Sequence, residues 1–257
     1  MLDLHRLCKC VAAGVLLGLL AFPASSGAQG TSRFELALEG GPVWQTRNDV
    51  RIPNDASGTR FSLVDLVGQG PWPAVRLEIG WNINRRHGLR ALLAPLSYTE
   101  SGEFRAPVSF AGQAYAAGAA TEATYQFNSW RLGYRYRFRD SARWKLSVGF
   151  TAKIRDAKIE LQQGTVTSKD TDVGFVPLLH FDADWHAAGK WNLSLDADGL
   201  AGGPGRAIDA ALQLGYSISD RFTLAAGYRT LEGGADVESV YNFAWLHYAI
   251  VSATWRL

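Results

Sequence analysis

The chain is almost free of cysteine. Its 257 residues include only two, Cys8 and Cys10, and both lie at the very start. The remainder can therefore form no disulfide framework and carry out no thiol chemistry. An excess of one charge sign is also lacking, because 26 lysine and arginine residues face 24 aspartate and glutamate residues, a formal net charge of +2. Such a balance argues against a protein that binds nucleic acid.

Long apolar runs are scarce as well. The one clear run, residues 11–22, follows Arg6 and Lys9 and is followed by proline and small residues. A helix that spans a bilayer needs about 20 apolar residues, so this run is too short to be one. Its charged start, apolar centre and small-residue end predict a secretory signal peptide over residues 1–28. Residues 29–257 are then expected to form a single domain.

What the chain has in abundance is alternation of apolar and polar residues, the pattern of a half-buried strand. A change of phase near Asn128 predicts a β-bulge there. The ten alternating segments are residues 34–39, 75–83, 88–99, 122–138, 144–155, 172–185, 191–198, 208–218, 222–228 and 241–257.

The connections between these segments alternate between short and long. Short connections lie at 84–87, 139–143, 186–190 and 219–220, and longer ones at 50–73, 100–121, 156–171 and 232–240, with a shorter glycine-rich one at 201–206. This alternation is typical of a membrane barrel with short periplasmic turns and longer extracellular loops. A closed barrel also pairs every backbone group without water. We therefore predict an all-β protein, a single up-and-down antiparallel transmembrane β-barrel of ten strands, with eight or twelve as alternatives.

Aromatic residues gather beside the short connections and in the apolar phase of their strands. A ring of such residues at one level is typical of the interfacial girdle of a membrane barrel. The girdle is predicted to contain Trp81, Trp144, Trp185, Trp191 and Trp255.

The leader, the strand pattern and the terminal AIVSATWRL together resemble the small outer-membrane β-barrel proteins of Gram-negative bacteria, a porin-like and OmpW-like superfamily. In that family the last strand usually ends on Phe, whereas this chain ends on Leu257, two residues after Trp255. The resemblance implies localisation to the outer membrane after signal-peptide removal. It also implies outer-membrane lipid, lipopolysaccharide and the barrel assembly machinery as partners, with small polar solutes as candidates, and no cofactor and no nucleic acid.

Charged residues in the polar phase are expected to point into the lumen, with a basic wall beside an acidic one. Buried charges persist only when they are paired. One interpretation is a salt-bridged plug between consecutive strands, and the other is a transverse field across a small aqueous pore. The predicted lumen charges are Arg131, Arg135, Arg137, Lys145 and Lys153 against Asp182, Asp184, Asp196 and Asp198.

Two histidine patterns are candidates for a metal-binding or catalytic site. His180, Asp182, Asp184 and His186 share one strand face, but alternate residues lie about 7 Å apart and the four span about 20 Å. One metal ion could take two of them at most, so we interpret them as lumen packing, with no metal site and no catalytic residue assigned. His247 is expected to face lipid within an aromatic girdle.

These patterns favour a non-enzymatic outer-membrane barrel, either a narrow channel or a structural or surface protein with a charged lumen. The alternative is an outer-membrane enzyme that acts on lipid A or peptides at the extracellular rim. Because one fold hosts many functions, the barrel pattern alone does not decide between them.

Overall fold

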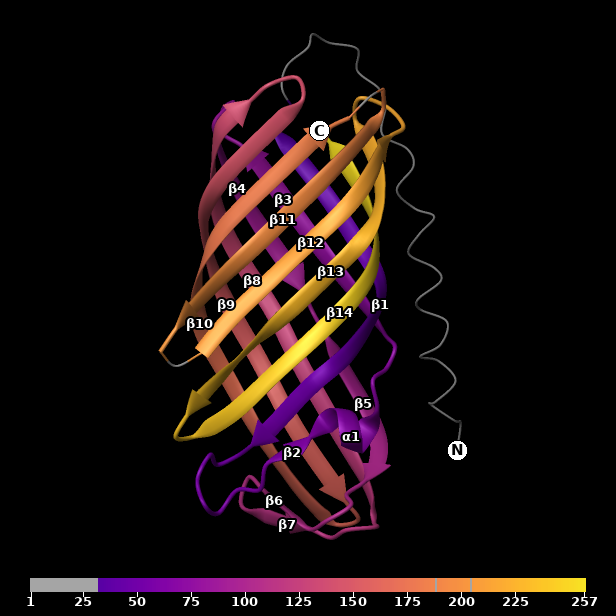
Figure 1. Cartoon of the computed structure of the whole chain (residues 1–257), viewed down its shortest axis with the longest axis vertical. Coiled ribbons are helices and arrows are strands. Elements are labelled where there is room, and N and C mark those ends of the chain that lie inside the picture. The colour runs from indigo at the N-terminus through magenta and orange to yellow at the C-terminus, as the bar shows by residue number, and fades with distance from the viewer. Residues whose placement is uncertain (1–31, 188, 204) are drawn as a thin grey trace, which may run out of the picture. The chain divides into compact units, whose positions relative to one another are not determined.

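The computed structural model describes residues 32–187, 189–203 and 205–257, so the predicted signal peptide lies outside the described residues. Ten antiparallel strands, each beside its neighbour in the chain, form a barrel that closes where β1 pairs with β14 (Figure 1). The predicted all-β barrel and its ten strands are confirmed. The barrel strands are β1 (Phe34–Arg51), β3 (Trp72–Asn82), β4 (His87–Ala94) continued by β5 (Ser97–Glu103), β8 (Ala120–Asp140), β9 (Trp144–Gln163), β10 (Val166–His186), β11 (Trp191–Gly202), β12 (Gly205–Ser217), β13 (Phe222–Val237) and β14 (Val240–Arg256).

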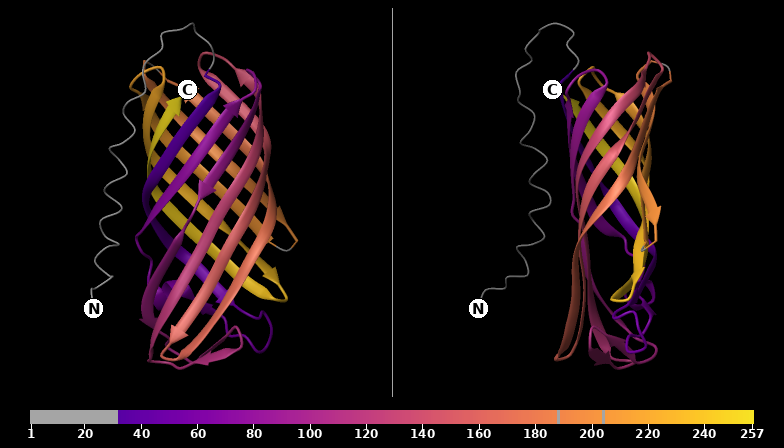
Figure 2. Two further views of the ribbon diagram at one scale, coloured as in Figure 1. Left: turned by 180° about the vertical axis from the view of Figure 1, so that it is seen from behind. Right: turned by 90° about the vertical axis from the view of Figure 1, so that its left-hand side faces the viewer.

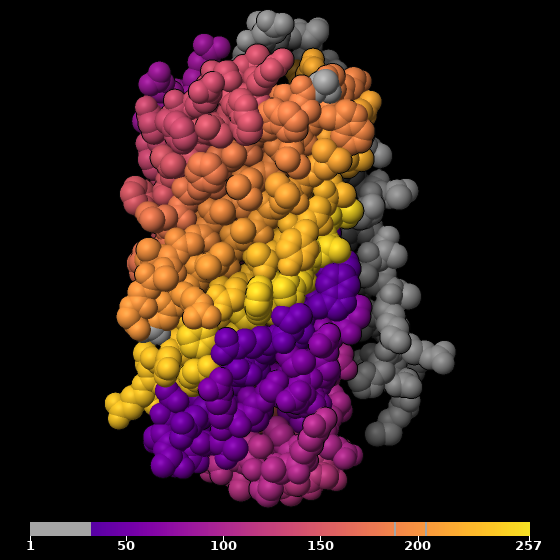
Figure 3. Space-filling model, in the orientation of Figure 1, coloured from indigo at the N-terminus to yellow at the C-terminus, as the bar shows by residue number. Residues whose placement is uncertain are grey.

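Closure is visible on the surface of the barrel. The yellow β14 lies directly against the indigo β1 (Figure 3), with Leu36 opposite Trp255 in the register. Every strand therefore has a partner on each side over part of its length, which removes the free edges of an open sheet.

Smaller elements lie at the end of the barrel opposite the short turns, which we call the loop end (Figure 1). They are β2 (Phe61–Ser62), α1 (Leu63–Val67), β6 (Val108–Phe110) and β7 (Gln113–Tyr115). Ser62 caps α1, because its hydroxyl accepts a hydrogen bond from the backbone N–H of Asp65. Leu63 and Leu66 of this helix are buried. None of the helices among the described residues has the length and apolarity needed to cross a membrane.

Two of the long loops expected from the sequence are strands instead. β9 and β10 run through residues 156–171 and meet at a tight turn, where Gly164 adopts a φ of 58° that favours glycine. β13 and β14 are likewise separated by two residues rather than by a loop over 232–240. β8, β9 and β10 extend further at the loop end than β11 to β14 (Figure 2). In the extension of β9 the apolar residues Ile159 and Leu161 point inward, whereas Val148 of the same strand points outward, so the alternation does not continue in one phase.

The predicted bulge near Asn128 is also wrong. The β8–β9 register passes unbroken through Asn128, and its shift lies between Arg137 and Arg139. The apolar pattern changes phase near Asn128 because the interior changes there. Tyr125 is buried inside the barrel, whereas Leu132 is exposed on the outside.

Candidate functional site in the barrel interior

A group of charged side chains, most of them buried, fills the half of the interior nearer the short turns, and we call it the charged layer. Its members are Glu39, Arg76, Arg90, Arg131, His180, Asp182, Asp196, Asp198, Asp209 and Arg229. All of them stand in the inward phase of their strands. The alternation of side chains along each strand therefore brings charges from six or more strands into one space.

Asp209 of β12 is the centre of the charged layer and is only 3% exposed. Its carboxylate accepts hydrogen bonds from Arg76 at 3.1 Å, from Arg131 at 2.5 Å and from Arg229 at 2.5 Å. Arg76 and Arg131 come from β3 and β8 and reach Asp209 across the lumen, whereas Arg229 stands on β13, the strand next to β12. Glu39 of β1 supplies a second carboxylate, which accepts two hydrogen bonds from Arg229.

Asp198 of β11 holds a second set of contacts. It accepts hydrogen bonds from Arg90 at 3.1 Å, Arg131 at 2.8 Å and the Thr151 hydroxyl at 2.8 Å. The Nδ1 atom of His180 lies 3.0 Å from Oδ1 of Asp198, the oxygen to which Thr151 donates. Arg131 thus links this set to Asp209, and the layer forms one connected network.

His180 is joined to only part of its predicted cluster. Its Nε2 atom lies 3.1 Å from Asp182, and Arg90 donates to Asp196 at 2.7 Å nearby. Asp184 and His186 lie further toward the short turns on the same strand, as a span of about 20 Å requires. The four residues therefore do not converge on one point. Residues 32–257, where described, contain no group of three His, Cys, Asp or Glu side chains arranged to hold a metal ion.

The basic residues predicted for the lumen behave differently from one another. Arg131 joins both aspartates, whereas Arg135 donates to the Asn82 side chain at 2.8 Å and Arg137 to the Arg85 carbonyl at 3.4 Å, both toward the short turns. Lys153 is buried, with its Nζ atom 4.7 Å from the centre of the Phe127 ring. Lys145 stands opposite Asp184 in the β9–β10 register.

The ion pairs differ from the expected contact between neighbouring walls. In the described part of the chain, Asp196 and Asp198 pair with arginines across the lumen and not with the lysines of β9. Glu39, Arg76, Arg90 and Arg229 are not among the predicted lumen charges, because each is a single charge within a largely apolar segment and not part of a block of like charge on consecutive strands. Their inward phase within apolar segments was the available signal.

The half of the interior nearer the loop end has the opposite character, and we call it the apolar layer. Tyr98 stacks on Trp72 with ring centres 3.7 Å apart, and its hydroxyl donates to Gln45 at 2.6 Å. Side chains from α1, β6 and β7 take part, so the loops close this end. The layer includes Val43, Val50, Leu63, Tyr98, Phe110, Tyr115, Tyr125, Leu161, Leu246 and Tyr248.

The five predicted girdle tryptophans lie on the outer wall at the short-turn end. Each meets an aromatic residue on the adjacent strand: Phe34 with Trp81, Trp144 with Trp185, Trp191 with Tyr216, and Phe222 with Trp255, at ring-centre distances between 4.9 and 6.4 Å. His247 lies against the exposed rings of Tyr228 and Trp245, nearer the loop end. A role of these rings at a membrane interface stays a prediction.

No protein-family model matches the chain, and no curated protein is similar to it in sequence. Among solved structures, the outer membrane protease OmpT from Escherichia coli has a TM-score of 0.51 at 8% identity, over 90% of this chain and 99% of that one. Ail of Yersinia pestis has a TM-score of 0.40 at 10% identity, over 86% and 99% of the two chains. Neisserial surface protein A has a TM-score of 0.37 at 12% identity, over 87% and 97%. The likeness to OmpT supports the fold alone, and this chain has the fold of an outer-membrane β-barrel.

Proposed function

We propose that the chain is an integral outer-membrane protein with a closed lumen, and that it acts as a non-enzymatic structural or surface-contact protein rather than as a channel. Its exposed apolar wall and its aromatic ring beside the short turns fit a barrel that spans a bilayer. Outer-membrane lipid and lipopolysaccharide would surround it, and the barrel assembly machinery would insert it.

The observation that carries this proposal is the burial of the charged layer. Asp209 shares three arginines within hydrogen-bond distance and is almost fully removed from solvent. A water-filled pore would hydrate such groups, and isolated buried charges would be very costly without these partners. The apolar layer, on the loop-end side of the charged layer, is also buried, with Leu246 at 0% exposure. Of the two expected roles of the lumen charges, the plug fits this burial and the aqueous pore does not.

A non-enzymatic role is supported by how the acids and histidines are used. Both ring nitrogens of His180 lie against carboxylates inside the barrel, beyond the reach of a lipid or peptide at the rim. His247 lies on the outer wall between aromatic rings. Incubation of the purified protein with lipid A or with unfolded peptides is expected to give no product, and any cleavage or acyl transfer would contradict this part of the proposal.

Conductance measurement tests the closed lumen. We expect the mature protein to fractionate with the outer membrane and to give no stepwise current in planar lipid bilayers, while a porin run in parallel does. Steps whose ion selectivity changes in Asp196→Asn would show instead that water and ions pass the charged layer. Recovery of the mature chain as a soluble periplasmic protein would contradict the membrane assignment itself.

A further inference from the structure

The wall of the barrel has a seam between β3 and the strand formed by β4 and β5. The β3–β4 register runs from the short turn up to Leu77 opposite Leu93, and β5 continues by pairing with β8. Extended by the same rule, the register would set Val75 opposite Pro95 and Pro73 opposite Ser97. Each of the first two outward-facing pairs beyond the end of the ladder therefore contains a proline, Pro95 in the first pair and Pro73 in the second.

The two prolines remove the donors that the ladder needs at this place. In β3, Asn82 donates its N–H to Arg33 on one side and Ile83 donates to His87 on the other. Odd-numbered residues of β3 therefore bond toward β4, and antiparallel strands exchange their bonds in alternate pairs. Pro73 and Pro95 both fall in such bonding pairs, and neither has an N–H to give. The ladder stops because of these residues, and the backbone groups of Val75 and Ser97 that would have continued it face the seam.

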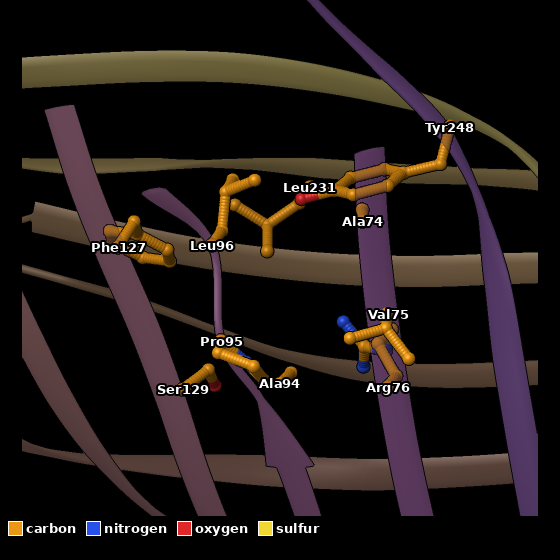
Figure 4. A pocket seen from close by; sticks show the side chains of 10 residues that line it. All are labelled: Ala74, Val75, Arg76, Ala94, Pro95, Leu96, Phe127, Ser129, Leu231 and Tyr248. Carbon is orange, nitrogen blue, oxygen red and sulfur yellow. The ribbon is translucent and has the colours of Figure 1, made fainter. Parts of the chain in front are cut away.

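A notch occupies the seam. Its outer part has a volume of about 330 Å3 and is lined by Pro73, Ala74, Val75, Pro95, Leu96 and Ser97. Further in, a space of about 10 Å3, enough for one water molecule, lies between Ala74, Leu96, Leu231 and Tyr248 (Figure 4). Arg76 borders this inner space and belongs to the charged layer. The notch thus leads from the outer wall to the boundary between the two layers of the interior.

The notch lies at a depth where hydrocarbon surrounds the barrel. Seven residues separate Ala74 from Trp81 in the aromatic ring at the short-turn end. With a rise of about 3.3 Å per residue and a strand tilt of about 40°, Ala74 stands about 17 Å along the barrel axis from that ring. The lipid-facing band of such barrels is about 25 Å tall, so the notch opens into its outer-leaflet half.

We propose that this notch binds one acyl chain of an outer-leaflet lipid, with the terminal methyl of the chain directed toward Leu231 and Tyr248. The lining side chains are apolar apart from Ser97 and Asn128. The opening faces lipid, and the volume is at the small end of ligand pockets, which are about 300–1,000 Å3. One flexible chain fits such a space, and a lipid with all its chains does not.

The test restores the missing donors. In the double variant Pro73→Val and Pro95→Val, both bonding pairs can form, the seam closes and the notch is lost. The mature protein is reconstituted in vesicles of palmitoyl-oleoyl phosphatidylethanolamine, extracted into detergent and analysed by native mass spectrometry. We expect one lipid to be retained per wild-type barrel. Loss of two or more buried methylene groups lowers affinity about tenfold, so the double variant should retain about tenfold less.

Matched variants keep the result interpretable. Pro177→Val replaces an exposed proline of β10, whose partner in β9 is Ala152, and should retain lipid as the wild type does. Leu231→Phe fills the inner space from the opposite wall without touching the seam, and should also lower lipid retention. It provides the test if the double variant does not fold. Wild-type protein without bound lipid, or unchanged retention in the variants, overturns the proposal. Retention of added palmitate but not of the phospholipid overturns the proposed occupant.

Discussion

The two layers of the barrel interior are built by the same strands but hold together in different ways. β1 contributes Glu39 to the charged layer and Val43 to the apolar layer, and β8 contributes Arg131 and Tyr125 in the same manner. From Glu39 to Val43 and from Tyr125 to Arg131 the inward phase is continuous, so only the kind of residue changes. The same barrel backbone can therefore enclose either charged or apolar side chains, provided that the charges are paired and the apolar volume is filled.

The two layers differ in how well they tolerate the substitution of a single side chain. A buried charge must find a partner of opposite sign in good geometry, and removing one partner leaves the other uncompensated. A buried apolar side chain needs only a filled volume, and neighbours can relax partly when it is shortened. The charged layer should therefore respond more sharply to a single change than the apolar layer does.

The largest effect is expected from Asp209→Asn in the charged layer. The change leaves Arg76, Arg131 and Arg229 around a neutral amide, and should lower the free energy of unfolding by about 4 kcal/mol. Urea titration of the barrel in detergent or vesicles, followed by tryptophan fluorescence, measures it. Asp220→Asn at an exposed short turn is the control and should leave stability unchanged. Wild-type stability in Asp209→Asn would mean that water already hydrates the layer.

A slightly smaller effect is expected from Leu246→Ala in the apolar layer. Leu246 is fully buried, and truncation leaves a cavity, which should cost about 3 kcal/mol in the same titration. Val237→Ala, near the tip of β13 and partly exposed, should cost much less. If Leu246→Ala proves harmless, the loop end of the barrel is open or loosely packed, and the contrast between the layers fails.

Tyr98→Phe tests the polar contacts that lie within the apolar layer. The change keeps the stacking on Trp72 but removes one of two donors to the Gln45 side-chain oxygen, which still accepts from Asn48 at 3.0 Å. Loss of one buried hydrogen bond should cost about 1 kcal/mol. Tyr136→Phe is the control, because its hydroxyl contacts only the exposed Arg86 at 3.3 Å. An equal loss in both variants would show that the Tyr98 hydroxyl is hydrated.

The smallest effect is expected outside both layers, at the exposed pair of Arg206 and Glu232 near the loop end. Surface pairs gain little because solvent and salt screen them. Glu232→Gln should therefore change the unfolding midpoint only slightly, and the difference should disappear in 1 M NaCl. The Asp209→Asn loss should persist at that salt concentration, since buried pairs are screened much less. A loss at Asp209 that vanishes in salt would place this residue in water.

Much of the fold could be predicted because its signals are local. Alternation along β3, β9 and β12 depends on neighbours two residues apart, and it identified strands, their outward faces and the short turns between them. The signal failed where the apolar face turns inward, as at Ile159 in β9 and at Tyr125 in β8. In both places the surroundings of the strand change while its backbone does not.

The ten-stranded barrel, the gathering of tryptophans beside the short turns and the inward direction of many charges all follow from the amino-acid sequence alone. Only the tertiary structure decided that Arg131 meets Asp209 across the lumen, that the loops close one end, and that the ladder stops at Leu77 and Leu93. The reason is that the direction of a side chain follows from a repeat of two residues. The partner of that side chain depends on the register of every strand pair between them around the closed barrel.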